Sequence, residues 1–108
     1  MLHLVETEEY ADWLDSMRDR MAKARIIKQM QRVQNAGYYV GDWKSVGEGV
    51  FENRIDVGPG YRVYSAIEGN VVLLLLVGGD KSSQRRDIPR AQAMLKEWRE
   101  AHRGGVWQ

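Results

Sequence analysis

The sequence contains no cysteine and only two histidines, His3 and His102, among its 108 residues. Without cysteine the chain has no disulfide framework, no thiolate metal ligand and no thiol nucleophile. Two lone histidines do not assemble a histidine-rich metal site, and neither an HExxH motif nor a carboxylate-rich calcium loop occurs. We therefore expect a protein that functions without a metal or another cofactor.

Long hydrophobic runs are also missing. The longest uninterrupted apolar stretch runs from Val71 to Val77, which is far shorter than the roughly 20 residues that span a bilayer. The N-terminal residues 1–13 lack the basic and apolar regions of a signal peptide. These absences predict a cytoplasmic protein without a membrane partner.

The composition is that of a small folded protein. Hydrophobic residues make up 44% of the chain and charged residues 29%, which is too apolar for a disordered chain. The length suits one domain. We expect a single domain over residues 1–103 and a frayed tail over residues 104–108.

The net charge is only +1, but the charges are unevenly distributed. Residues 1–17 hold five acids and no base, whereas residues 18–32 hold six bases and one acid. Residues 81–103 hold seven bases and three acids. Such asymmetry indicates either a basic surface for a polyanion or simply solvated helix faces.

The first half of the chain shows helical periodicity. After a short strand within residues 2–5, a helix is predicted over about residues 7–17, with Thr7 as its N-cap. A second helix is predicted to begin at the cap Asp19 and to stop at Gly37. The two segments form a helical hairpin.

The second half switches to the alternating pattern of β-strands. Strands are predicted over residues 50–57, 61–67 and 71–77, with a further short one near 44–46. The last strand is apolar on both faces, as expected where helices cover both sides. A final helix is predicted from about Ile88, with Asp87 as cap and Pro89 in its first turn. The fold class is therefore α+β, a β-α-α-β-β-β-α chain with an antiparallel meander, an N-terminal helical hairpin and a C-terminal helix.

The alternation places Arg54, Arg62 and Tyr64 on one face of neighbouring strands, where cross-strand side chains meet. Two adjacent guanidinium groups need an anion between them, either Glu52 or Asp56 or an external phosphate. In one interpretation Arg54 only pairs with these acids on a solvated face. In the other, the arginines bind an RNA backbone and Tyr64 stacks on a base.

If the protein cleaves RNA, the side chains available for catalysis predict a metal-independent reaction. The 2′-OH of RNA attacks the adjacent phosphorus, and Arg54 and Arg62 stabilise the charge that develops. Lys81 would transfer protons if neighbouring cations favoured its neutral form.

Two motifs at a characteristic separation carry a family resemblance: GPGYRVY at residues 58–64 and GGDKS at residues 78–82. Together with KSVGEGV at residues 44–50, they make the chain resemble the phage-derived Gp49-like, HigB-type "addiction module killer" branch of the RelE/ParE superfamily. This resemblance covers nearly the whole chain and implies a RelE-like fold.

The resemblance further implies the toxin of a type II toxin–antitoxin system, neutralised by a cognate antitoxin of helix-turn-helix type. Most members of the superfamily are mRNA endonucleases (mRNA interferases) that act on the ribosome, whereas ParE-like members bind and inhibit DNA gyrase. Both alternatives stay open, as does a module that has lost its toxicity. The residues that the resemblance assigns to catalysis are Arg54, Arg62 and Lys81, and those it assigns to RNA binding are Lys44, Tyr64 and Arg85. Tyr61 and Tyr64 could equally belong to the core.

Asn53 departs from the family pattern, which has an apolar residue between Glu52 and Arg54. Burial of an amide without a partner is unfavourable. Either Asn53 is hydrogen-bonded to the backbone, or the strand is bulged at this point and Arg54 is redirected.

Overall fold

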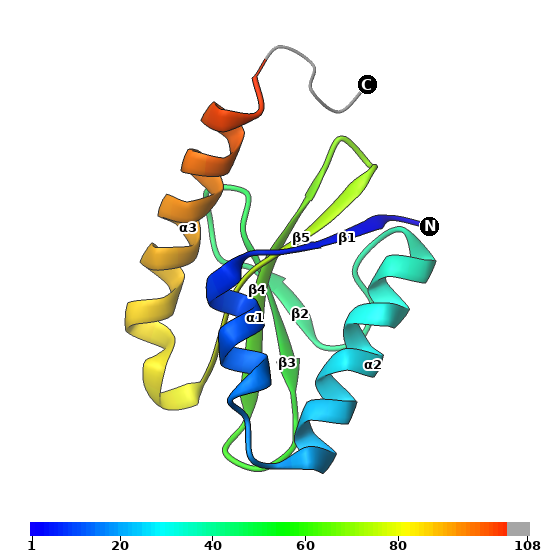
Figure 1. Ribbon diagram of the computed structural model, residues 1–108, viewed down its shortest axis with the longest axis vertical. Helices are drawn as coiled ribbons and strands as arrows, with labels where there is room; N and C mark the ends of the chain where they lie inside the picture. Colours follow the sequence, from blue (N-terminus) through cyan, green and yellow to red (C-terminus); the bar gives the residue numbers. More distant parts are fainter. Residues whose placement is uncertain (104–108) are drawn as a thin grey trace.

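The computed structural model describes residues 1–103, so the frayed tail predicted over residues 104–108 lies outside the described residues. The described chain is a five-stranded sheet with helices on both sides (Figure 1). In chain order the elements are β1 (His3–Glu6), α1 (Glu8–Asp15), α2 (Arg20–Ala36), β2 (Trp43–Ser45), β3 (Phe51–Ile55), β4 (Tyr61–Glu68), β5 (Val72–Asp80), the 3-10 helix η1 (Lys81–Ser83) and α3 (Gln84–Ala101).

The strands follow the order β1-β5-β4-β3-β2. The meander from β2 to β5 is antiparallel throughout, which confirms the predicted α+β class, and the short strand near residues 44–46 is present as β2. In contrast, β1 pairs with β5 in parallel. Because β1 and β5 are far apart in the sequence, their pairing could not be predicted from local patterns.

The helix boundaries follow from local capping. Thr7 accepts a hydrogen bond from the Tyr10 amide, and Asp19 accepts one from the Ala22 amide. Gly37 ends α2 at φ 80°, a conformation that favours glycine. These three predicted caps are confirmed. Within residues 1–103 no helix is long and apolar enough to cross a membrane.

Two hydrophobic clusters lie on opposite faces of the sheet. In Figure 1, α1 lies in front of the strands, α2 lies to its right and α3 lies to its left. Ile26 and Met30 of α2 belong to one cluster, and Ala91 and Leu95 of α3 belong to the other. Residues 72–77 of β5 are buried between them, as the sequence predicted, and removal of this apolar surface from water stabilises both layers.

The start of α3 differs from the prediction. The helix begins at Gln84 rather than near Ile88, and Asp87 is a buried residue inside the helix rather than its cap. The Asp87 carboxylate accepts a hydrogen bond from the hydroxyl of Ser83, the residue that precedes α3, so it acts within the first turn of the helix rather than as its cap. Pro89 lies inside the helix, and the assumption that proline marks the first turn was therefore wrong here.

Candidate functional site

The candidate site is centred on a pair of arginines at adjacent ends of β3 and β4. Arg54 lies directly opposite Arg62 in the strand register, and Glu52 lies opposite Tyr64. Opposed residues on antiparallel strands point to the same face. The prediction that Arg54, Arg62 and Tyr64 share a face is therefore confirmed, and this face is the one that α3 covers farther along the strands.

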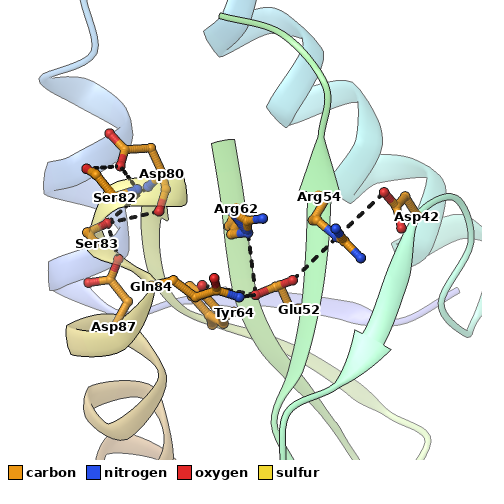
Figure 2. A network of polar contacts seen from close by, with 10 residues as sticks. All are labelled: Asp42, Glu52, Arg54, Arg62, Tyr64, Asp80, Ser82, Ser83, Gln84 and Asp87. Carbon is orange, nitrogen blue, oxygen red and sulfur yellow. Dashed lines mark hydrogen bonds and ion pairs between the residues drawn. The ribbon is translucent and has the colours of Figure 1, made fainter. Parts of the chain in front are cut away.

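The carboxylate of Glu52 lies between the two guanidinium groups (Figure 2). Its Oε1 is 3.6 Å from Nε of Arg54, and its Oε2 is 3.6 Å from Nε of Arg62. Oε2 also accepts hydrogen bonds from the Tyr64 hydroxyl at 3.1 Å and from Nε2 of Gln84 at 2.9 Å. Glu52 is completely buried, so it is an internal counterion rather than a solvated surface acid.

One carboxylate does not satisfy both arginines. Arg62 is 8% exposed, and its Nε and Nη1 have no hydrogen-bond partner, because 3.6 Å is longer than an N–H···O bond. Arg54 has a second ion pair, with Asp42 at 3.6 Å. Unpaired buried donors are costly, so the Arg62 guanidinium has hydrogen-bonding capacity that Glu52 alone does not satisfy.

A depression of about 370 Å³ lies over this pair. Arg54, Arg62 and Lys81 line it together with the loop of residues 58–60, and we call it the Arg54–Arg62 depression. The structure thus brings together the three residues predicted for catalysis, from three separate segments. Among residues 1–103 no group of three His, Asp or Glu side chains is placed to hold a metal ion.

Lys81 is positioned by a compact polar turn. Asp80 caps η1 by accepting a hydrogen bond from the Ser82 amide at 2.8 Å. Hydrogen bonds from the Ser82 side chain and from nearby amides lower the pKa of the Asp80 carboxyl. Ser83 links this turn to α3 by donating to Asp87 (Figure 2). The Lys81 backbone is therefore held to the first turns of α3.

Gly79 allows this close approach of α3 to β5. A Cβ at this position would overlap the Asp87 carboxylate and the Ser83 hydroxyl oxygen. Glycine is therefore required by packing rather than by its backbone dihedral angles. The GGDKS motif contributes this packing as well as the lysine.

The residues predicted for RNA binding lie in different environments. Tyr64 is completely buried, and burial raises its pKa. The base-stacking role predicted for Tyr64 is therefore wrong, because α3 and the sheet cover the ring. Lys44 is exposed and lies opposite Glu52 in the register of β2 and β3. Arg85 is exposed in the first turn of α3 and does not line the depression.

Asn53 is accommodated without a bulge in β3. The pairing of β3 with β4 is continuous, and the register shift near this region occurs in the pairing of β4 with β5, between Tyr64 and Ser65. Asn53 is buried, and its Nδ2 donates to the Val40 carbonyl at 3.2 Å. The first of the two alternatives, a backbone hydrogen bond, is the one observed, and Arg54 keeps its place opposite Arg62.

Sequence reasoning missed the partners that orient the arginines. It offered Glu52 as a possible counterion, but not as a buried one held by Tyr64 and Gln84. The alternating pattern of the strand places Glu52 on the same face as the arginines. The pattern does not show which residues of that face α3 covers. Asp42 gave no signal, because it lies in an irregular segment before β2.

Comparison with known proteins finds similarity in sequence and in structure. No family model matches the chain. An uncharacterized protein of Haemophilus influenzae is 41% identical over 96 residues, which cover 89% of this chain and 95% of that protein. A double arginine-to-alanine mutant of Escherichia coli toxin RelE, solved in the free state, matches 86% of this chain and 95% of its own at a TM-score of 0.68 and 13% identity. The chain therefore belongs to the same family as the H. influenzae protein, and it has a RelE-like fold.

Proposed function

We propose that this chain is the toxin of a type II toxin–antitoxin pair of the HigB-type, Gp49-like branch, and that it cleaves mRNA in the Arg54–Arg62 depression. The observation that carries the proposal is the convergence of Arg54, Arg62 and Lys81 from three separate segments on one depression. Planar guanidinium groups suit the oxygens of a phosphodiester.

The reaction requires no covalent intermediate with the protein. The 2′-oxygen forms a bond to phosphorus, the bond from phosphorus to the 5′-oxygen breaks, and a 2′,3′-cyclic phosphate and a 5′-hydroxyl end result. Arg54 and Arg62 stabilise the negative charge of the phosphorane, which is the main catalytic contribution. The exposed Lys81 donates a proton to the leaving 5′-oxygen.

A carboxylate at the rim supplies an acceptor for the 2′-hydroxyl proton. Asp42 and Asp56 are the acids that line the depression among the described residues. Asp42 is paired with Arg54, whereas Asp56 forms no ion pair within residues 1–103 and is exposed to solvent. We assign the proton-acceptor role to Asp56, so that acid and base are carried by different segments.

The cellular partners proposed for this toxin are mRNA on the ribosome, in the cytoplasm, and a cognate antitoxin of helix-turn-helix type. The resemblance of the sequence motifs and the RelE-like fold support both partners. A basic depression of this kind is complementary to an acidic segment of an antitoxin, which would cover it by electrostatic attraction.

Mapping of mRNA 5′ ends after brief expression without antitoxin tests the proposal. The variant Arg62→Lys keeps the charge but loses the planar fork that contacts two oxygens, and Lys96→Ala on the exposed face of α3 is the control. We expect growth arrest and new 5′-hydroxyl ends with wild type and Lys96→Ala, and neither with Arg62→Lys.

Two results would contradict the proposal. Growth arrest without new RNA ends would reject the endonuclease activity and direct the search to DNA gyrase, the target of ParE-like toxins. Normal growth with a folded wild-type chain would indicate a module without toxicity.

A further inference from the structure

A second hollow lies beside the Arg54–Arg62 depression, between α2 and the end of β3. It has a volume of about 330 Å³, and Arg25, Lys28 and Arg32 of α2 line one wall. We call it the α2 groove. Arg54 and Asp42 line both hollows, so the α2 groove continues directly from the candidate site.

The three bases of α2 form one row on the helix. Their spacing of three and four residues places Arg25, Lys28 and Arg32 on the same face, and all three are exposed. None forms an ion pair with an acid within residues 1–103, although Arg32 donates to the Gln29 side chain at 3.2 Å. Like charges at this spacing destabilise a helix, so an anionic ligand would relieve their repulsion.

The charge of the two hollows is strongly unbalanced. Six bases and two acids line them, and Asp42 is already paired with Arg54. The excess of positive charge does not extend over the whole surface, since the exposed residues Glu8, Glu9 and Asp12 make α1 acidic. A continuous basic path therefore leads from Lys81 past the two central arginines to α2.

We propose that the α2 groove binds the sugar–phosphate backbone of the same RNA strand that is cleaved in the Arg54–Arg62 depression. This inference rests on the proposed function and extends it to a substrate at least several nucleotides long. Single-stranded nucleic acids are bound by basic grooves that follow the backbone. A protein ligand fits less well, because Ile55 is the one aliphatic residue in the lining, and protein interfaces have a more apolar centre.

Binding of two oligonucleotide lengths separates the α2 groove from the depression. The probes are a trinucleotide and a decanucleotide of single-stranded RNA, 2′-O-methylated so that the attacking hydroxyl is blocked. Affinities are measured for wild type, for Lys28→Ala, for the triple variant Arg25→Ala/Lys28→Ala/Arg32→Ala, and for Lys96→Ala. Lys96 is a matched control, because it is likewise an exposed lysine in the middle of a helix.

The expected effect depends on the length of the probe. A phosphate contact with a single strand contributes a salt slope of about 0.7, which corresponds to about fivefold in affinity at roughly 0.1 M salt. We therefore expect about a fivefold loss of decanucleotide affinity for Lys28→Ala and about a 100-fold loss for the triple variant, with a shallower salt dependence. The trinucleotide affinity should be unchanged, and Lys96→Ala should bind both probes as wild type does.

Three results would overturn the inference. If the triple variant binds the decanucleotide as tightly as wild type, the α2 groove does not hold RNA, and the proposed function stands. If it loses affinity for a poly-glutamate peptide but not for RNA, the groove belongs to an acidic protein partner. If wild type binds neither oligonucleotide, both the inference and direct RNA binding at the depression are rejected, even where the chain still arrests growth.

Discussion

Arg54 and Arg62 lie directly opposite each other on β3 and β4, and the Nε atom of each is 3.6 Å from a different oxygen of the Glu52 carboxylate. Two cations therefore share one buried anion. Asp42 supplies a second acid to Arg54 from the exposed side, whereas Arg62 has no such partner within the described chain. Arg62 therefore depends on Glu52 alone for its counterion, while Arg54 and Lys81 line the same depression and could contact a phosphate there.

Inorganic phosphate should stabilise the folded protein. A ligand that binds only the native state raises the free energy of unfolding by about 1.4 kcal/mol at a concentration of about ten times its Kd. We expect phosphate to raise the Tm of wild type and Lys96→Ala, and to leave the Tm of Arg62→Gln nearly unchanged. Calorimetry with matched concentrations of chloride controls for ionic strength. An equal shift in all three proteins would show that phosphate does not bind at Arg62.

Substitution of Glu52 should destabilise the protein, and the loss should be larger when the new side chain has no hydrogen-bond acceptor. Glu52→Ala leaves the buried guanidinium of Arg62 without its counterion, which costs about 3–5 kcal/mol. Glu52→Gln should cost less, because its amide oxygen still accepts hydrogen bonds from Tyr64 and Gln84. Urea unfolding monitored by circular dichroism measures both values. Equal losses for the two variants would mean that the hydrogen bonds to Glu52 contribute little.

Stability should fall at alkaline pH because three tyrosines are buried. Burial raises the pKa values of Tyr10, Tyr39 and Tyr64 above the ordinary value of 10.0. The stabilisation from a raised pKa is complete below the pKa of the unfolded chain and is lost as pH rises toward the folded value. The free energy of unfolding should therefore decrease from about pH 10 upward, by up to about 1.4 kcal/mol per pH unit for each tyrosine.

The variant Tyr64→Phe isolates the contribution of one ring to this alkaline effect. It removes the ionisable hydroxyl and should flatten the pH dependence relative to wild type, while it costs about 1 kcal/mol near neutrality through loss of the hydrogen bond to Glu52. Urea midpoints at a series of alkaline pH values provide the measurement. Parallel curves for the two proteins would contradict the burial of the Tyr64 hydroxyl.

Alanine at Gly79 should impair both packing and RNA cleavage. The added methyl group overlaps Asp87 and Ser83, so we expect a loss of about 1–3 kcal/mol and a displacement of the turn that carries Lys81. Gly78→Ala is the matched control, because its methyl group overlaps the Trp13 ring and leaves the Ser83–Asp87 contact in place.

Cleavage rates of the two glycine variants are compared at a temperature where both are fully folded. Gly79→Ala should then cleave RNA more slowly than Gly78→Ala. Equal rates would indicate that the position of Lys81 does not depend on the contact between β5 and α3.

Local chemistry was sufficient to predict much of this protein from its sequence. The caps at Thr7, Asp19 and Gly37 depend on contacts within one turn of the chain. The shared face of Arg54 and Arg62 follows from strict alternation along two adjacent strands. These features could be read directly because each depends on neighbours in sequence or on one short connection.

Only the tertiary structure determined which side chains are buried and which line the two hollows. Alternation assigned Tyr64 to the arginine face, but the packing of α3 buried its ring and made Glu52 an internal counterion. The parallel pairing of β1 with β5 and the α2 groove likewise depend on contacts between distant segments. Periodicity specifies the direction in which a side chain points, whereas burial depends on which element of the chain packs above it.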